Sequence, residues 1–80
     1  MNVLCVSIEP DTIAIHLPPH DFEPPPPEQW SDIADLHARC GWPLGPGLAG
    51  YGPLDVLQLG SQVEGIHLRY CIACFPLGPP

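Results

Sequence analysis

Residues 3–17, VLCVSIEPDTIAIHL, have the pattern of a β-hairpin. Residues 3–8 are rich in β-branched and apolar side chains, and isoleucine or leucine occupies every other position in residues 13–17. Each half therefore presents one apolar face, as a half-buried strand does. Residues 9–12, EPDT, place proline second in a turn, where its ring presets the backbone angle φ. We predict two paired strands at this end of the chain.

An amphipathic helix is expected over residues 28–40, next to the prolines of residues 24–27. Proline suits the first turn of a helix, Gly41 can cap the last turn and Pro43 prevents continuation. On a helical wheel one broad face collects Trp30, Ile33, Leu36, His37 and Cys40. The opposite face carries Glu28, Asp32 and Asp35.

The last third of the chain suggests two further strands. Residues 54–59 form a short apolar run and residues 60–62 read as a turn. Residues 66–73 alternate apolar and mixed side chains, which is typical of a strand. The expected fold is α+β, a small antiparallel sheet in ββαββ order with one packed amphipathic helix.

One domain, residues 1–80, is expected from the length of the chain. Thirteen prolines and eight glycines gather in three blocks between the apolar runs. We interpret residues 18–27 as a proline-rich connector, residues 43–53 as a Gly/Pro-rich loop and residues 76–80 as a C-terminal tail.

The charge balance restricts the partners. Nine carboxylates stand against two arginines and no lysine, which gives a formal net charge of −7. Because nucleic-acid affinity comes mainly from cations that displace counterions, direct binding to DNA, RNA or an anionic membrane is disfavoured. A protein partner with a basic surface is favoured.

No apolar run reaches the ~18 residues of a membrane span, and no basic segment precedes the first apolar run. We therefore expect a cytoplasmic protein with reduced thiols.

Catalysis is not expected, and no catalytic residue is assigned. His16, His20 and His67 have no carboxylate at a spacing that suggests a triad or a metal cluster. A glycine-rich phosphate loop is absent, and a chain without lysine cannot form a P-loop or a Schiff base.

The cysteines leave two interpretations open. Cys71 and Cys74 form a CxxC pair, but in a strand these two positions point to opposite faces, which favours ordinary cysteines and no metal cofactor. The alternative is a Cys₃His zinc site, which requires the last strand to kink at Cys71. Its ligands would be His37, Cys40, Cys71 and Cys74.

The acidic residues suggest a binding surface. Five carboxylates lie within fifteen residues without an intervening cation: Asp21, Glu23, Glu28, Asp32 and Asp35. On the expected helix the last three would form one stripe about 10 Å long, with the sign and rough spacing of phosphate charges.

Three functional hypotheses follow. In size and charge the chain is similar to phage-encoded anti-CRISPR proteins and DNA mimics, which implies a stoichiometric inhibitor that occupies the basic, nucleic-acid-binding surface of a partner. The first alternative is a small zinc-stabilised binding module. The second is an accessory subunit anchored by the apolar loop, in which Trp42 and Tyr51 would be the contact residues.

Overall fold

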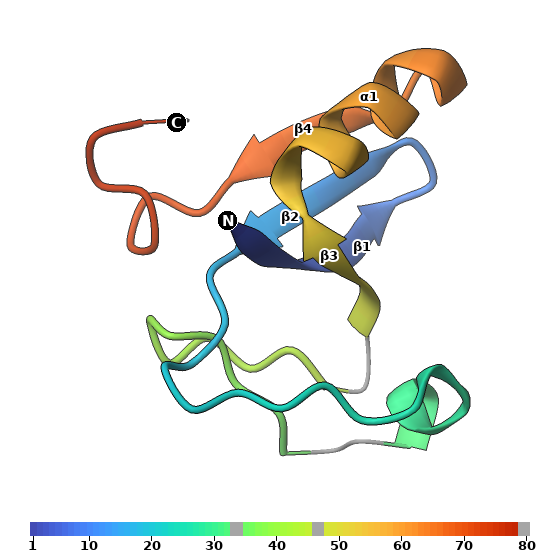
Figure 1. Ribbon diagram of the computed structural model, residues 1–80. Helices are drawn as coiled ribbons and strands as arrows, with labels where there is room; N and C mark the ends of the chain where they lie inside the picture. Colours follow the sequence, from blue (N-terminus) through green and yellow to red (C-terminus); the bar gives the residue numbers. More distant parts are fainter. Residues whose placement is uncertain (33–34, 46–47, 79–80) are drawn as a thin grey trace.

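A four-stranded sheet and one α-helix make up the fold of the computed structural model, which describes residues 1–32, 35–45 and 48–78 (Figure 1). The elements in chain order are β1 (Asn2–Glu9), β2 (Thr12–His16), the 3₁₀ helix η1 (Pro27–Asp32), β3 (Leu48–Pro53), α1 (Leu54–Glu64) and β4 (His67–Tyr70). The strand order across the sheet is β3-β1-β2-β4. The α+β class and the hairpin over residues 3–17 are confirmed.

The sheet is mixed, and the expectation of an antiparallel ββαββ sheet is wrong. β1 pairs antiparallel with both β2 and β3, but β4 pairs parallel with β2. The physical reason is the connection: α1 follows β3 directly and carries the chain across the sheet to its opposite edge, and a crossover of this kind returns the chain in the same direction. The carboxyl ends of β2 and β4 consequently lie side by side.

The helix lies at α1 and not at residues 28–40. Residues 54–59, expected as a strand, and the expected turn at residues 60–62 both belong to α1. Leu54 and Ser61 are the buried positions of this helix, with Leu57 packed against the core between them, a spacing of three and four residues. Gly65 ends the helix in the left-handed conformation, with φ of 71°, which glycine adopts without strain.

Residues 28–40 do not continue as a helix beyond η1 in the described part of the chain; Ile33 and Ala34 lie outside the described residues. Instead, residues 36–38 and 42–44 run beside each other and are joined by backbone hydrogen bonds. Leu44 N–H donates to the Leu36 carbonyl at 2.8 Å, and Ala38 N–H donates to the Trp42 carbonyl at 2.9 Å. This loop buries Ala38 and Leu44 in the core.

Two further boundaries differ from expectation. The second half of the expected loop at residues 43–53 is the edge strand β3, where glycine and proline are tolerated because one side of the strand is unpaired. The last strand stops at Tyr70, because the chain turns over residues 72–74. Within the expected tail at residues 76–80, Pro79 and Pro80 lie outside the described residues.

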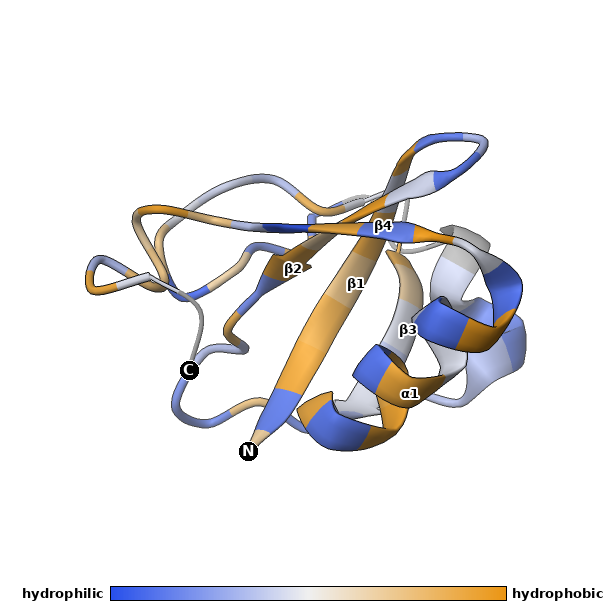
Figure 2. Cartoon of the chain, turned by 90° about the horizontal axis from the view of Figure 1, so that it is seen from above, coloured by the Kyte–Doolittle hydropathy of each residue, from blue (hydrophilic) through white to orange (hydrophobic). Residues whose placement is uncertain are grey.

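The core forms on both faces of β1, the strand that Figure 2 colours as hydrophobic along most of its length. Val3, Leu4 and Ile15 are the largest fully buried side chains. α1 packs on one face of the sheet, and the irregular segment between β2 and β3 lies on the other side (Figure 1). Across the described ranges, no helix combines the length and hydropathy needed to cross a bilayer.

A candidate metal centre at the ends of β2 and β4

The parallel pairing of β2 with β4 brings a histidine beside a cysteine. Ile15 and Tyr70 are the last partners in the register, and the next residues are His16 and Cys71. The Cys71 N–H donates to the Ile15 carbonyl at 3.0 Å, which extends the ladder by one bond. His16, the last residue of β2, is buried.

Cys40 reaches the same place from the irregular segment. It lies in a tight turn in which the Gly41 N–H donates to the Ala38 carbonyl at 2.9 Å. The Arg39 N–H donates to the carbonyl of Leu17, also at 2.9 Å, and this bond ties the turn to the residue that follows His16. The turn therefore presents the Cys40 thiol to the end of β2.

Cys74 joins the group because residues 71–75 form a turn. The Phe75 N–H donates to the Cys71 carbonyl at 2.8 Å, so the CxxC pair wraps around a single turn and does not continue β4. A turn of this kind is what a CxxC motif needs to aim both sulfurs at one point. The expectation that the Cys71 and Cys74 side chains diverge in a strand is wrong for this reason.

The four side chains form one compact cluster: His16, Cys40, Cys71 and Cys74. Their ligand atoms all lie within 4.8 Å of one another. Cys40 Sγ is 3.8 Å from Cys71 Sγ and 4.0 Å from His16 Nδ1. A tetrahedral zinc site with Zn–S bonds of about 2.3 Å has sulfur–sulfur edges of about 3.8 Å. The distance between the Cys40 and Cys71 sulfurs matches that edge. The three cysteines of the cluster, like Cys5 elsewhere in the chain, are free of disulfides.

The electrostatics of the cluster differ from thiol to thiol. Burial raises the pKa of Cys74 to about 11. Burial also acts to raise the pKa of Cys71, but the backbone N–H groups of Cys74 and Ala73 and the Cys40 thiol hydrogen-bond to its sulfur, and the net result is a lowered pKa. Burial lowers the pKa of His16 below its usual 6.5, so its imidazole is neutral at pH 7, the form that binds metals.

His37 does not belong to this cluster, and His16 takes its place. The sequence argument placed His37 and Cys40 one helical turn apart, but the helix that would align them is not formed. His37 is exposed, and its Nδ1 lies 2.7 Å from the Asp35 carbonyl oxygen. His16 was missed because the pairing of β2 with β4 joins residues more than fifty positions apart. The only local signal was a histidine at the end of a strand.

The indole of Trp42 stacks on the imidazole of His16, with ring centroids 6.4 Å apart and planes inclined by 17°. Trp42 is otherwise 61% exposed.

Tyr51, expected in the same apolar loop, lies half-buried in β3 instead. Its ring packs against Phe22 at 5.1 Å and its hydroxyl accepts a hydrogen bond from the side chain of Asn2. Trp42 and Tyr51 are therefore not neighbours on one loop.

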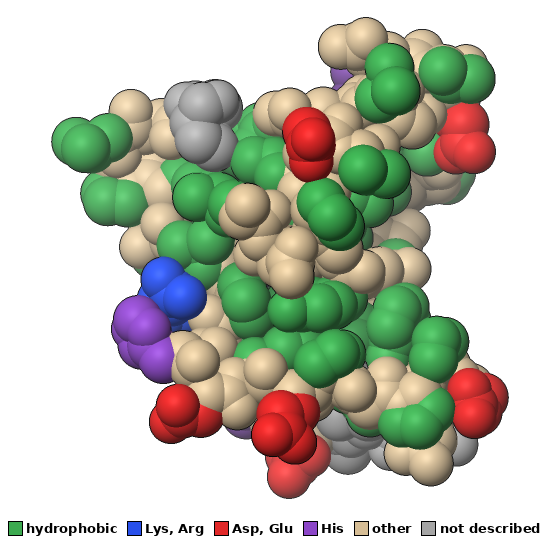
Figure 3. Space-filling view, in the orientation of Figure 1, with side chains coloured by type: hydrophobic (Ala, Val, Ile, Leu, Met, Phe, Trp, Pro, Cys, Tyr) green, Lys and Arg blue, Asp and Glu red, His purple; other side chains and the backbone are tan. Residues whose placement is uncertain are grey.

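The acidic residues remain on the surface but do not form the expected stripe. Four of them are exposed: Asp21, Glu23, Glu28 and Asp35. The side chain of Asp32 lies outside the described part of the structure. On the face drawn in Figure 3 some acidic side chains lie close together at the bottom of the view, and the others stand apart near the top and the right edge. Because no helix links Glu28 to Asp35 through the described residues, their spacing along a helix has no counterpart in the fold.

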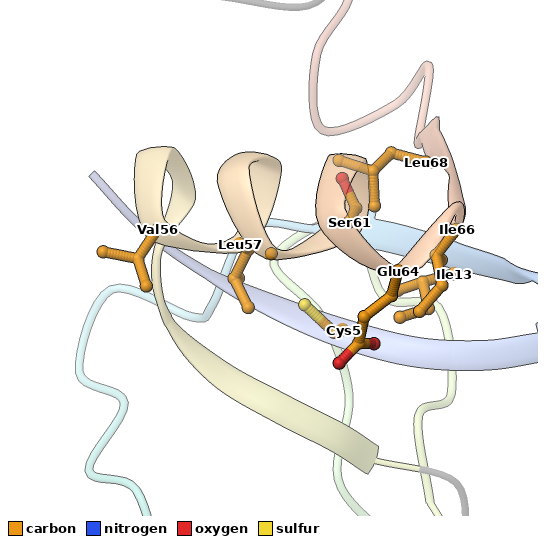
Figure 4. Close-up of a pocket in the computed structure, with 9 residues that line it drawn as sticks. Cys5, Ile13, Val56, Leu57, Ser61, Glu64, Ile66 and Leu68 are labelled. Atoms are coloured by element: carbon orange, nitrogen blue, oxygen red, sulfur yellow. The ribbon is translucent and has the colours of Figure 1, made fainter.

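The fourth cysteine, Cys5, lies elsewhere. It lines a pocket of about 230 Å³ between α1 and the sheet, together with Leu57, Ser61 and Leu68 (Figure 4). Burial raises its pKa to about 11. The remaining lining is mostly apolar, and Glu64 at the rim is exposed. We interpret Cys5 as a core residue.

Comparisons of the chain with protein-family models, with curated proteins and with solved structures find no significant match.

Proposed function

We propose that the protein is a small zinc-stabilised binding module, in which one Zn²⁺ is held by His16, Cys40, Cys71 and Cys74. The observation that carries the proposal is the convergence of these four ligand atoms within 4.8 Å. They come from three separate parts of the chain, the end of β2, the turn at Cys40 and the turn after β4.

The donor set supports a structural role for the metal. Three thiolates and one imidazole complete a tetrahedral shell, whereas catalytic zinc sites keep one position open for water or substrate. A zinc ion held by these four ligands would have no open position for substrate. The metal would act as a cross-link between segments of the polypeptide.

A cross-link of this kind would stabilise a fold of this size. Chains of this size bury only about 60% of the surface that the unfolded chain exposes, and many of them require metal, disulfides or a partner. Residues 17–26 and 36–45 contribute no strand to the sheet. Zinc at Cys40 would fasten the second of these segments to both parallel strands and so fix the surface that it carries.

The inhibitor hypothesis stays a prediction. The net charge of −7 and the exposed carboxylates still favour a basic partner, and still disfavour direct nucleic-acid binding. The helix that was expected to align Glu28, Asp32 and Asp35 is not formed over the described residues, so one argument for the inhibitor hypothesis is lost. For the accessory-subunit hypothesis, Trp42 remains as an expected contact residue. Tyr51 does not, because it is packed into β3.

Cobalt substitution tests the proposal. Co²⁺ bound by three thiolates and one imidazole in tetrahedral geometry gives strong thiolate charge-transfer bands and visible d–d bands. We expect these bands from the intact protein at one equivalent of Co²⁺, and weaker or altered bands from Cys40→Ser, Cys71→Ser and Cys74→Ser.

The matched control is Cys5→Ala, which removes the one cysteine outside the cluster and should keep the wild-type spectrum. Equal loss of the bands in the Cys5 variant, or no tetrahedral bands in the intact protein, would contradict the proposed site.

A further inference from the structure

An open groove lies directly beside the candidate metal centre. It has a volume of about 500 Å³, and His16 is part of its wall. β1, β2 and β4 all contribute to its lining, through Val6, Ala14 and Arg69. Along β1, Leu4 is buried, Val6 is half-buried and Ile8 is 47% exposed. We call this feature the Trp42 groove and define it by Val6, Ile8, Ala14, Trp42, Arg69 and Ile72.

Large apolar side chains meet at the Trp42 groove from three elements. Ile8 comes from β1, Trp42 from the loop before β3 and Ile72 from the turn after β4. Trp42 is 61% exposed and Ile72 is 82% exposed. Single exposed apolar residues are normal, but a contiguous group around a concave surface marks a binding site.

One cation lies in this apolar surface. Arg69 is exposed and lines the groove, because it is the register partner of Ala14. Within the described ranges it forms no salt bridge, although the chain holds nine carboxylates. The other arginine, Arg39, donates from Nε to the Pro18 carbonyl at 3.0 Å. An unpaired guanidinium fits a carboxylate through two parallel hydrogen bonds.

We propose that the Trp42 groove docks a short segment of a partner protein that combines apolar side chains with one carboxylate directed at Arg69. The apolar side chains contact Trp42 and Ile72. A second copy of this chain is disfavoured as the occupant, because each copy carries a net charge of −7 and the two would repel. The same net charge disfavours a segment with many carboxylates.

This inference rests on the proposed function, since a zinc-bound His16 would fix the position of Trp42. The two rings stack, and the turn that carries Cys40 leads directly into Trp42. Zinc would hold this wall of the groove in the docking geometry. A side chain that is already positioned loses less conformational entropy on binding.

The test is selection from a displayed library of random heptapeptides against the zinc-supplemented full chain. One library presents free C-termini and the other presents peptides fused at their C-termini, which separates a terminal carboxylate from an aspartate or glutamate side chain. We expect enriched peptides to share apolar residues and one carboxylate. Changing that carboxylate to an amide should weaken binding about tenfold or more.

Matched variants locate the binding. Arg69→Gln should weaken the enriched peptides about tenfold or more, whereas Arg39→Gln changes the net charge equally and should leave binding within about twofold. Ile72→Ser should weaken binding in the same way, whereas Val63→Ser should not. Val63 is 80% exposed on α1, so it matches the exposure of Ile72 on a different surface.

Zinc content, measured on every variant, separates the two proposals. Zinc-loaded protein that enriches no peptide, enriches basic or uncharged peptides, or binds equally well as Arg69→Gln would overturn the groove proposal alone. Protein that holds no zinc but binds carboxylate peptides through Arg69 would overturn the metal site and keep the groove. Self-association of the zinc-loaded chain through Ile72, seen by sedimentation, would also overturn the groove proposal.

Discussion

The backbone N–H of Cys71 donates a 3.0 Å hydrogen bond to the carbonyl oxygen of Ile15. This bond is the last rung between the parallel strands β2 and β4, and it places Cys71 next to His16. A CxxC turn begins at Cys71, so the end of the sheet leads directly into the cluster of thiols. The register of β2 with β4 therefore sets the positions of two of the four candidate ligands, His16 and Cys71.

Metal removal should lower thermal stability strongly. At the proposed site zinc would bind the folded chain far better than the unfolded one, and a free concentration of 1,000 times Kd would stabilise the fold by about 4 kcal/mol. In a domain of this size each kcal/mol corresponds to about 4–8 °C. We expect a chelator to lower the Tm by about 20 °C, measured by circular dichroism, and added zinc to restore it. Cys74→Ser should start at the lower Tm and respond little to the chelator.

Zinc binding should release protons, and Cys74 should account for one of them. With a pKa of about 11 in the metal-free fold, its thiol is protonated at pH 8 and must lose that proton to bind zinc. His16 releases none at this pH, because its pKa lies below 6.5. Affinity should therefore increase as the pH rises from 6 to 8.

Calorimetry in buffers of different ionisation enthalpy measures the number of protons released. Cys74→Ser should release one proton fewer than the intact chain. An equal count in the two proteins would contradict the assignment of Cys74 as a ligand.

Alkylation should distinguish two kinds of protected cysteine. Cys40 is exposed, so only bound metal would shield its thiol. Cys5 is 2% exposed and its pKa is raised to about 11, so the fold itself shields it. With zinc, iodoacetamide should modify neither at pH 7.5. After chelation, below the unfolding temperature, mass spectrometry should find Cys40 modified first. Modification of Cys5 before Cys40 would count against this arrangement.

Trp42 should report on the metal through its stack with His16. Zinc at the imidazole changes the charge distribution beside the indole, so the fluorescence of Trp42 should change during a zinc titration and reach its limit at one equivalent. Trp30 is the control, because its Nε1–H is bonded to the Pro25 carbonyl at 2.9 Å. Trp30→Phe should retain the response and Trp42→Phe should lose it. Retention of the response in Trp42→Phe would show that it arises elsewhere.

The predictable parts of the fold are the local ones. The hairpin at residues 3–17 follows from alternation and from a turn containing Pro10, and both signals lie within a few residues. α1 was missed because residues 54–59 alone resemble a short strand. The buried spacing from Leu54 through Leu57 to Ser61 appears only over the longer window.

The candidate site needed contacts that no local pattern contains. The sequence groups the CxxC pair with Cys40 only in the zinc alternative, where His37 is the fourth ligand, and the favoured interpretation is ordinary cysteines without metal. The fourth ligand depended on the parallel pairing of β2 with β4, and that pairing follows from the path of α1. The alternation of Leu68, Tyr70 and Ile72 also extended the expected strand through Cys71. In the fold, Ile72 lies in the turn and faces solvent.

The most direct measurement of the central claim compares the zinc content of two histidine variants. His16 lies in the cluster, whereas His37 is exposed and outside it, so one substitution tests the site and the other serves as its control. Native mass spectrometry of the protein purified without chelators should find one zinc per chain in the wild type and in His37→Ala. His16→Ala should hold zinc at least about tenfold more weakly. A wild-type protein without zinc, or equal zinc retention in both variants, would contradict the account.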